Sequence, residues 1–283
     1  MRVFLTGASG ILGSDIKVEL EKNNHEVLGF DSKTIDITSL HDVKNKVDHF
    51  NPALIIHSAA MTNVDLCEED KNAALMANVI GTHNLSLAAN GCNAKIVYIS
   101  SCGVYGNNKK EPHTELDAVH PVNYHHYTKL LGEQRIKDHH TQYLIVRPGW
   151  LFGGTPVHKK NFIEARRKEA TNHPVLKSAV DKFGSPTYTA DLAKQLMQLL
   201  QEDIYGTFNM VNEGAASRFD YVAEIVKVFN LKNEMQPVRS NEFPRKANMP
   251  DNEMLENLHL TLRKLNSMRP WQDALKDYIN LTY

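Results

Sequence analysis

The stretch RVFLTGASGILGSDIKVELEKN, residues 2–23, decides the fold of this chain. It opens with a short apolar run, passes through Gly7, Gly10 and Gly13, and continues with the apolar spacing of a helix. Glycine allows a tight turn and a close approach of the backbone to a pyrophosphate, and the following helix start offers unpaired N–H groups. The order strand, glycine turn, helix predicts a dinucleotide-binding unit, and a glycine-rich turn without a ligand is the alternative.

The alternation of apolar and amphipathic segments continues to about residue 150. We expect helices at residues 11–23, 39–50, 74–90 and 121–133, between strands at residues 2–6, 26–30, 53–59, 95–100 and 142–148. Strict alternation predicts a parallel sheet with helices on both faces. The expected fold class is α/β, a doubly wound (Rossmann) parallel sheet.

Beyond residue 150 the pattern loosens. Helical spacing recurs at residues 161–170 and 219–230, a strand-like run lies at residues 206–212, and prolines punctuate the tail. We therefore expect a dinucleotide-binding domain at residues 1–150. Residues 151–283 are expected to form a smaller substrate lobe on the carboxyl edge of the sheet, with some chain crossing back to the sheet.

The composition of the chain excludes several classes of binding partner. With 32 Lys and Arg against 33 Asp and Glu the formal net charge is −1, so the chain lacks the excess of positive charge that binding to nucleic acid or to an acidic membrane face requires. No apolar run is long enough to span a membrane or to resemble a signal peptide. Three cysteines without CxxC spacing fit a reducing cytoplasm and predict neither a disulfide framework nor a metal site. A small-molecule partner is the expectation.

Asp31 ends the second predicted strand, 18 residues after Gly13. A carboxylate at this place accepts hydrogen bonds from the adenine ribose and repels a 2′-phosphate, which favours NADH over NADPH. An ordinary turn or helix cap is the alternative for Asp31. Asp36, beside Ile37, either caps the next helix or touches the adenine.

Six further segments follow the glycine turn in the order of one family. They are SAAMTNVDLCE at residues 58–68, YISSCGVYG at 98–106, NYHHYTKLLGE at 123–133, IVRPGWLFG at 145–153, DKFGSPTYTADLA at 181–193 and MRPWQDALKDY at 268–278. Together they resemble the extended short-chain dehydrogenase/reductases, specifically the dTDP-4-dehydrorhamnose reductase group. That group also contains the regulatory β subunit of methionine adenosyltransferase, so the fold alone does not prove catalysis.

The resemblance implies an NAD(P)H-dependent reductase of a nucleoside-diphosphate 4-keto-6-deoxy sugar, with a sugar-nucleotide lobe, in deoxysugar and cell-surface polysaccharide biosynthesis. A cytoplasmic homodimer is a further expectation. In the family a tyrosine protonates the carbonyl, a lysine four residues later binds the nicotinamide ribose and lowers the tyrosine pKa, and a hydroxyl completes the contact. The implied catalytic residues are Ser101, His125 and Lys129. Implied cofactor contacts are Gly7, Ser9, Gly10, Ile11, Leu12, Gly13, Asp31, Asp36, Ile37, Ser58, Ala59, Ala60, Thr62, Ser100 and Lys129.

His125 stands at the family's tyrosine position. On a helix, a side chain four residues before Lys129 lies about 40° away around the axis, whereas Tyr124 and Tyr127 lie about 140° and 160° away. We therefore expect neither tyrosine to face the lysine. Lys129 and an oxidised nicotinamide would lower the pKa of His125, and its ring is shorter than a phenol. His125 acting through a water, Tyr124 swinging in at a frayed helix start, and a binding-only relative stay open.

The remaining implied contacts concern the sugar nucleotide: Val64, Cys102, Tyr105, Trp150 and Arg218. Cys102 is either an acid/base thiol or a small buried one, and Trp150 packs either on the sugar or in the core. An epimerase or dehydratase of the same fold is a weaker alternative.

Basic residues at 159–168 either meet a diphosphate or form a solvated helix face. Neighbouring histidines such as His125 and His126 point about 100° apart on a helix and predict no metal site. His113 and His120, in a loop rich in proline and acid, are expected to be solvated.

Overall fold

The computed structural model describes residues 1–283 and confirms the predicted alternation of strands and helices in the first half of the chain. A π-helical turn, Met76–Ile80, joins two of the helices. The elements in order are β1 Arg2–Thr6, α1 Ile11–Lys22, β2 Glu26–Phe30, α2 Leu40–Phe50, β3 Leu54–His57, α3 Val64–Glu69, α4 Lys71–Leu75, α5 Gly81–Gly91, β4 Lys95–Ile99, α6 Tyr124–His139 and β5 Tyr143–Pro148.

The second half is built from short strands, four longer helices and one short helix. Two short 3-10 turns lie in connecting loops, Cys102–Val104 before α6 and Ser240–Glu242 after β12. Its elements are β6 Trp150–Phe152, α7 Phe162–Asn172, β7 Val175–Ala179, β8 Phe183–Gly184, β9 Pro186–Tyr188, α8 Thr189–Gln201, β10 Gly206–Met210, β11 Ala216–Ser217, α9 Arg218–Val228, β12 Glu234–Val238, β13 Asn252–Glu253, α10 Leu258–Leu262 and α11 Trp271–Thr282.

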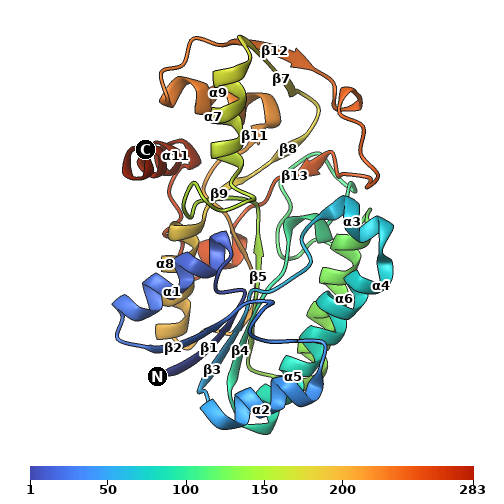
Figure 1. Cartoon of the computed structure of the whole chain (residues 1–283), viewed down its shortest axis with the longest axis vertical. Helices are drawn as coiled ribbons and strands as arrows, with labels where there is room; N and C mark the ends of the chain where they lie inside the picture. The colour runs from blue at the N-terminus through green and yellow to red at the C-terminus, as the bar shows by residue number, and fades with distance from the viewer.

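Six parallel strands form the central sheet in the order β10-β5-β4-β3-β1-β2. Helices α1 and α8 cover one face, and α2, α5 and α6 cover the other (Figure 1). Because both faces are covered, the inner strands are mostly apolar, as at Leu54–His57, where all four residues are buried. The strand order reverses at β1, between β2 and β3, and ligands of such sheets bind at the carboxyl ends beside this point.

The chain crosses back to the sheet after residue 150, because β10 pairs with β5 and α8 packs on α1. Helix α10 packs on β10, and the other late elements form a lobe above the carboxyl ends of the strands, at the top of Figure 1. An aromatic core that includes Trp150, Phe152, Tyr221 and Tyr278 holds this lobe together. The domain boundary at residue 150 remains a prediction.

The glycine turn leads from β1 into α1 by a close backbone approach. Gly7 has a φ of +72°, and a Cβ there would lie 2.7 Å from the backbone nitrogen of Ala59. A Cβ on Gly13 would lie only 2.0 Å from the Gly7 carbonyl oxygen. Helix α1 starts after Gly10 without a side-chain cap and without an acidic residue in its first turn. Its first N–H groups are therefore free to bind an anion.

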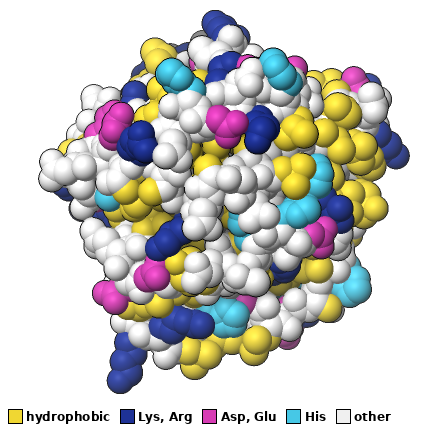
Figure 2. Space-filling view, turned by 90° about the horizontal axis from the view of Figure 1, so that it is seen from below, with side chains coloured by type: hydrophobic (Ala, Val, Ile, Leu, Met, Phe, Trp, Pro, Cys, Tyr) yellow, Lys and Arg dark blue, Asp and Glu magenta, His cyan; other side chains and the backbone are white.

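One expectation about the surface was wrong. His113 is fully buried, because its backbone bridges to Leu255 and its ring stacks on Tyr105 at 4.9 Å between centroids. His120 is exposed, as expected. On the face shown in Figure 2, basic and acidic side chains are interspersed with apolar ones, so that face carries no single-sign patch. No helix combines the length and the apolar composition that crossing a membrane requires.

We predict that Gly13→Ala destabilises the protein by about 1–3 kcal/mol or more, because its Cβ would overlap backbone that cannot move without opening the turn. The matched control is Gly91→Ala at the end of α5, where an added Cβ meets nothing within 4 Å. Its free energy of unfolding should change by less than about 1 kcal/mol. Urea unfolding followed by circular dichroism measures both, and equal effects would contradict the close-approach argument.

Candidate active site

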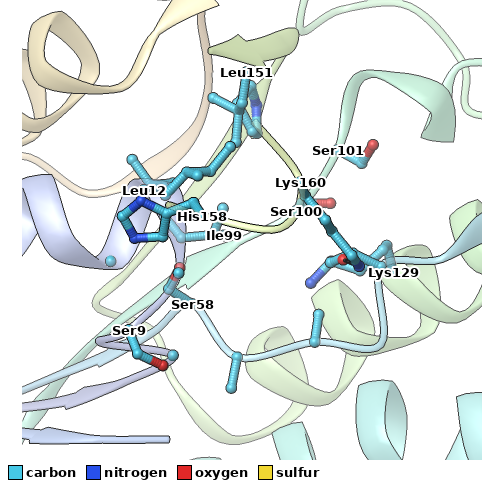
Figure 3. A pocket seen from close by; sticks show the side chains of 18 of the residues that line it. Ser9, Leu12, Ser58, Ile99, Ser100, Ser101, Lys129, Leu151, His158 and Lys160 are labelled. Carbon is cyan, nitrogen blue, oxygen red and sulfur yellow. Dashed lines mark hydrogen bonds between the residues drawn. The ribbon is translucent and has the colours of Figure 1, made fainter. Parts of the chain in front are cut away.

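A cavity of about 710 Å³ opens at the carboxyl ends of the strands, beside the glycine turn. Figure 3 shows Ser9 and Ser58 at one side of it and Ser100, Ser101 and Lys129 at the other. The predicted residues that line it are Gly7, Ser9, Gly10, Ile11, Leu12, Gly13, Asp31, Ser58, Ala59, Ala60, Thr62, Ser100, Ser101, His125 and Lys129. The fold therefore brings the three implied catalytic residues and most of the implied cofactor contacts to one cavity.

The glycine end of this cavity fits a dinucleotide. The uncapped start of α1 supplies N–H groups for a pyrophosphate, and the absence of Cβ atoms at Gly7 and Gly13 lets the turn close. Asp31 lies at the edge, where the backbone N–H of Lys33 donates to its carboxylate at 2.9 Å. That hydrogen bond, with one from the Thr34 hydroxyl, lowers the pKa of Asp31 and keeps its carboxylate ionised.

Helix α6 carries the catalytic end of the cavity, and its start is firmly capped. The Asn123 side chain accepts from the backbone N–H of His126 at 3.0 Å, and Glu68 accepts from that of Tyr124 at 2.7 Å. Tyr124 packs on Tyr127 and Lys71, at 5.9 Å between the rings and 5.3 Å from the lysine nitrogen. The two tyrosines thus pack on each other and not on Lys129, whose ammonium lies over the Tyr98 ring. Because the start of α6 is capped, it is not frayed, and this argues against a movement of Tyr124 towards Lys129.

Lys129 is buried, and its ammonium lies 4.2 Å above the centre of the Tyr98 ring. Burial lowers the pKa of Lys129 to about 7, and the nearby charge of Glu133 opposes this shift only in part. A lysine in this state exchanges its proton near neutral pH.

His125 is also buried, and its Nδ1 lies 3.0 Å from the carbonyl oxygen of Met61. A carbonyl oxygen only accepts, so Nδ1 carries the hydrogen and Nε2 keeps its lone pair. Burial lowers the pKa of His125 to about 3, with smaller effects from His126 and Lys129. The downward shift was expected from Lys129, but burial is its larger cause.

A buried ion pair fixes α6 on the sheet. Arg147 of β5 donates to both carboxylate oxygens of Glu133, at 2.8 and 2.6 Å, and the Ser100 hydroxyl donates to Glu133 at 2.6 Å. Neither charged side chain reaches water to a significant extent. Removing one partner of such a pair typically destabilises a protein by about 3–5 kcal/mol, so the pair holds the cavity wall rigidly.

A second cavity, of about 520 Å³, lies under the lobe and contains Trp150 and Arg218. The Arg218 guanidinium stacks 3.4 Å from the centre of the Trp150 ring, and the indole N–H donates to Glu253 at 2.8 Å. Three other basic residues line this cavity and each meets a carboxylate: Lys182 with Asp251, Arg245 with Asp65, and Lys246 with Glu69. Arg218 makes no hydrogen bond to a carboxylate and is free to bind an anion.

Five implied contacts line neither cavity. Asp36 accepts from the backbone and hydroxyl of Thr38, Ile37 packs against Gly81, and Val64 begins α3. Tyr105 is buried, bonded to Asn209 and Arg147. Cys102 is buried beside Glu253 at 3.6 Å, and burial raises the pKa of its thiol well above the ordinary value, which fits the buried-thiol alternative.

The whole sequence, residues 1–283, matches the RmlD substrate binding domain family. The chain belongs to this family. A solved dTDP-4-dehydrorhamnose reductase from Clostridium acetobutylicum is 37% identical, with a TM-score of 0.96 and 99% of each chain covered. One from Bacillus anthracis, solved in complex with NADP, is 33% identical, with a TM-score of 0.95 and 99% of each chain covered. The spore coat polysaccharide biosynthesis protein SpsK of Bacillus subtilis is 29% identical over 98% of this chain and 96% of its own.

Two residues of this RmlD-family site, His158 and Glu253, were not singled out by the sequence, whereas Lys159 and Lys160 were, as part of the basic stretch at 159–168. The segment before α7 reaches the main cavity with His158, Lys159 and Lys160, and Lys160 donates a hydrogen bond to the Thr62 hydroxyl. Within the basic stretch at 159–168, Lys159 and Lys160 therefore reach the cavity, whereas Arg166, Arg167 and Lys168 pair with glutamates of α7. Glu253 in the second cavity gave no sequence signal, because an isolated acidic residue in a tail has no distinguishing pattern.

We predict that the protein loses stability as the pH falls from 6.5 towards 4. Burial lowers the pKa of His57 and His125 to about 3 and that of His126 to about 4, so these rings stay neutral when folded but bind protons when unfolded. Each such ring should remove about 1.4 kcal/mol per pH unit below its unfolded pKa. Urea unfolding of the native chain and of His125→Gln measures this, and parallel curves would contradict it.

Proposed function

We propose that this protein reduces the C4 ketone of a nucleoside-diphosphate 4-keto-6-deoxy sugar with NAD(P)H, as a dTDP-4-dehydrorhamnose reductase. The observation that carries this proposal is the cavity in which Ser101 and Lys129 lie at one end and the glycine turn lies at the other. The reductase names of the relatives that match the whole chain support it. Those names do not favour the alternative of a binding-only regulatory subunit.

The residues at the catalytic end suit a carbonyl reduction. When bound, the nicotinamide supplies the hydride. The Ser101 hydroxyl offers a hydrogen bond to the carbonyl oxygen, and the Lys129 ammonium stabilises negative charge that develops there. The Ser100 hydroxyl donates to Glu133, and Ser100 forms the part of the cavity wall between Ser101 and Lys129.

The second cavity suits the nucleotide part of the substrate. It is rich in basic side chains, and Arg218 is the one whose guanidinium no carboxylate occupies. A planar guanidinium held against Trp150 presents its N–H groups to a diphosphate with little loss of side-chain entropy. We assign Arg218 to the diphosphate, and Trp150 both orients it and borders the sugar.

The test is oxidation of NADH and NADPH by the purified protein with dTDP-4-dehydrorhamnose, with the product identified by mass spectrometry as two hydrogens heavier than the substrate. We predict turnover by the native chain. In Arg218→Met the KM for the sugar nucleotide should rise roughly 10- to 100-fold, because one charge-assisted phosphate contact of about 1.5–3 kcal/mol is lost. NADPH binding, followed by fluorescence, should be unchanged. Cofactor binding without turnover by the native chain would refute the assigned reaction.

For the cofactor, we propose a preference for NADH that rests on Asp31. Neutralising Asp31 by Asp31→Asn should shift the ratio of the two cofactors' Kd values roughly tenfold towards NADPH, because the repulsion of the 2′-phosphate is removed. Asp36→Asn is the matched control, since Asp36 lies outside the cavity and only caps Thr38. Equal ratios in both variants would show that Asp31 does not face the ribose.

The setting of the reaction is a further part of the proposal. A role in polysaccharide biosynthesis is supported by the name of the Bacillus subtilis relative. A cytoplasmic homodimer remains a prediction from the sequence.

A further inference from the structure

The proposed reduction requires a proton at the carbonyl oxygen, and the usual tyrosine donor is absent. The following inference rests on the proposed function, and it concerns which side chain supplies that proton. Five imidazole or amine side chains line the main cavity: His125, Lys129, His158, Lys159 and Lys160. His125 and Lys129 share helix α6, and Lys160 bonds to Thr62.

His125 is built as an acceptor. Its only ring hydrogen is committed to the Met61 carbonyl, and Nε2 has no partner within the chain. To donate from Nε2, the ring would have to carry a positive charge while buried between His126, 5.2 Å away, and Lys129. Both the burial and the neighbouring lysine disfavour that charge.

The Lys129 ammonium can donate hydrogen bonds but has no acceptor within the chain. It rests on the Tyr98 ring. The closest carboxylate, Glu133 one turn later, is already bound by Arg147 and Ser100. The N–H groups of Lys129 are therefore available to a ligand in the cavity.

The groups that face Lys129 come from three elements. Tyr98 lies on β4, and His57 on β3 is held neutral between the Thr6 and Thr82 hydroxyls. His125 and Glu133 share the helix with it. Of these only Glu133 is charged at neutral pH, and Arg147 offsets that charge. Nothing around Lys129 therefore strongly favours its charged form, and a proton on it is easily given up.

We propose that Lys129 itself protonates the substrate's carbonyl oxygen, with His125 beside it as a fixed hydrogen-bond acceptor. As the carbonyl carbon gains the hydride, the π electron pair moves to oxygen, and that oxygen forms an O–H bond while one N–H bond of Lys129 breaks. The lysine passes from –NH₃⁺ to –NH₂ and regains its proton from water. The pKa of Lys129, about 7, is near the best value for a general acid at neutral pH.

Lys160 is the rival lysine. It reaches the cavity from the segment before α7, and its ammonium donates to the Thr62 hydroxyl. Lys160→Met should weaken cofactor binding but leave the pH dependence of turnover in place, because the proton donor is unchanged.

The first test needs no substrate. Competitive acetylation of all lysines across pH 5–11, read by peptide mass spectrometry, gives the pKa of each. Lys129 should be half protonated near pH 7, and Lys232, which is exposed and unpaired, is the internal comparison. A pKa for Lys129 equal to the one measured for Lys232 would overturn the inference.

The second test is the pH profile of kcat in variants. In the native chain kcat should fall as the pH rises through about 7, because the donor loses its proton. Lys129→Arg keeps the charge but cannot give up a proton, so kcat should drop about 10²–10⁴-fold while NADPH still binds. His125→Gln, whose amide can still donate to Met61, should lower kcat less than about tenfold and keep the fall near pH 7.

Two results would overturn this inference and leave the proposed function standing. One is loss of turnover in His125→Gln with turnover retained in Lys129→Arg. The other is an inactive native chain that becomes active as His125→Tyr, since the sugar would then be correct and the native donor missing. If neither chain turns over although NADPH binds to both, the proposed function fails, and this inference fails with it.

Discussion

The buried ion pair between Arg147 of β5 and Glu133 of α6 is the constraint on which the site depends. It ties the helix that carries His125 and Lys129 to the sheet that carries the glycine turn, and it holds Ser100 between them. It also affects the charge state of the site, because a carboxylate already paired with a guanidinium only partly stabilises the ammonium one turn earlier on the helix. The pairing of Glu133 with Arg147 therefore has two effects: it fixes α6 on the sheet, and it leaves the amine of Lys129 partly uncharged.

The two cavities are lined by residues that are neighbours in the chain. Trp150 lines the second cavity, and Leu151 lines the first. His125 lines the first cavity, while His126 lies 3.9 Å from Glu253 of the second. A nucleotide held at Arg218 would thus lie close to the cavity that contains the glycine turn and Lys129.

Much of the main cavity could be predicted, because its contacts belong to local patterns. Gly7, Gly10 and Gly13 are required by a turn that leaves no room for a Cβ, and Ser58 to Thr62 follow a strand end in a parallel sheet. Three other residues lie in the interior for a common reason. Cys102 and Tyr105 sit in the same quoted segment as Ser101, yet they turn into the interior, and His113 is buried by a partner more than a hundred residues away.

The sequence by itself determined the doubly wound sheet, the place of the cofactor turn and the presence of a histidine four residues before Lys129, because strand and helix periodicity and helical geometry are local. Only the tertiary structure decided what that histidine can do. Its tautomer depends on the Met61 carbonyl and its charge on burial, and the state of Lys129 depends on a carboxylate occupied by Arg147. Protonation is set by the surroundings of a group in space, and residues distant in the chain supply those surroundings.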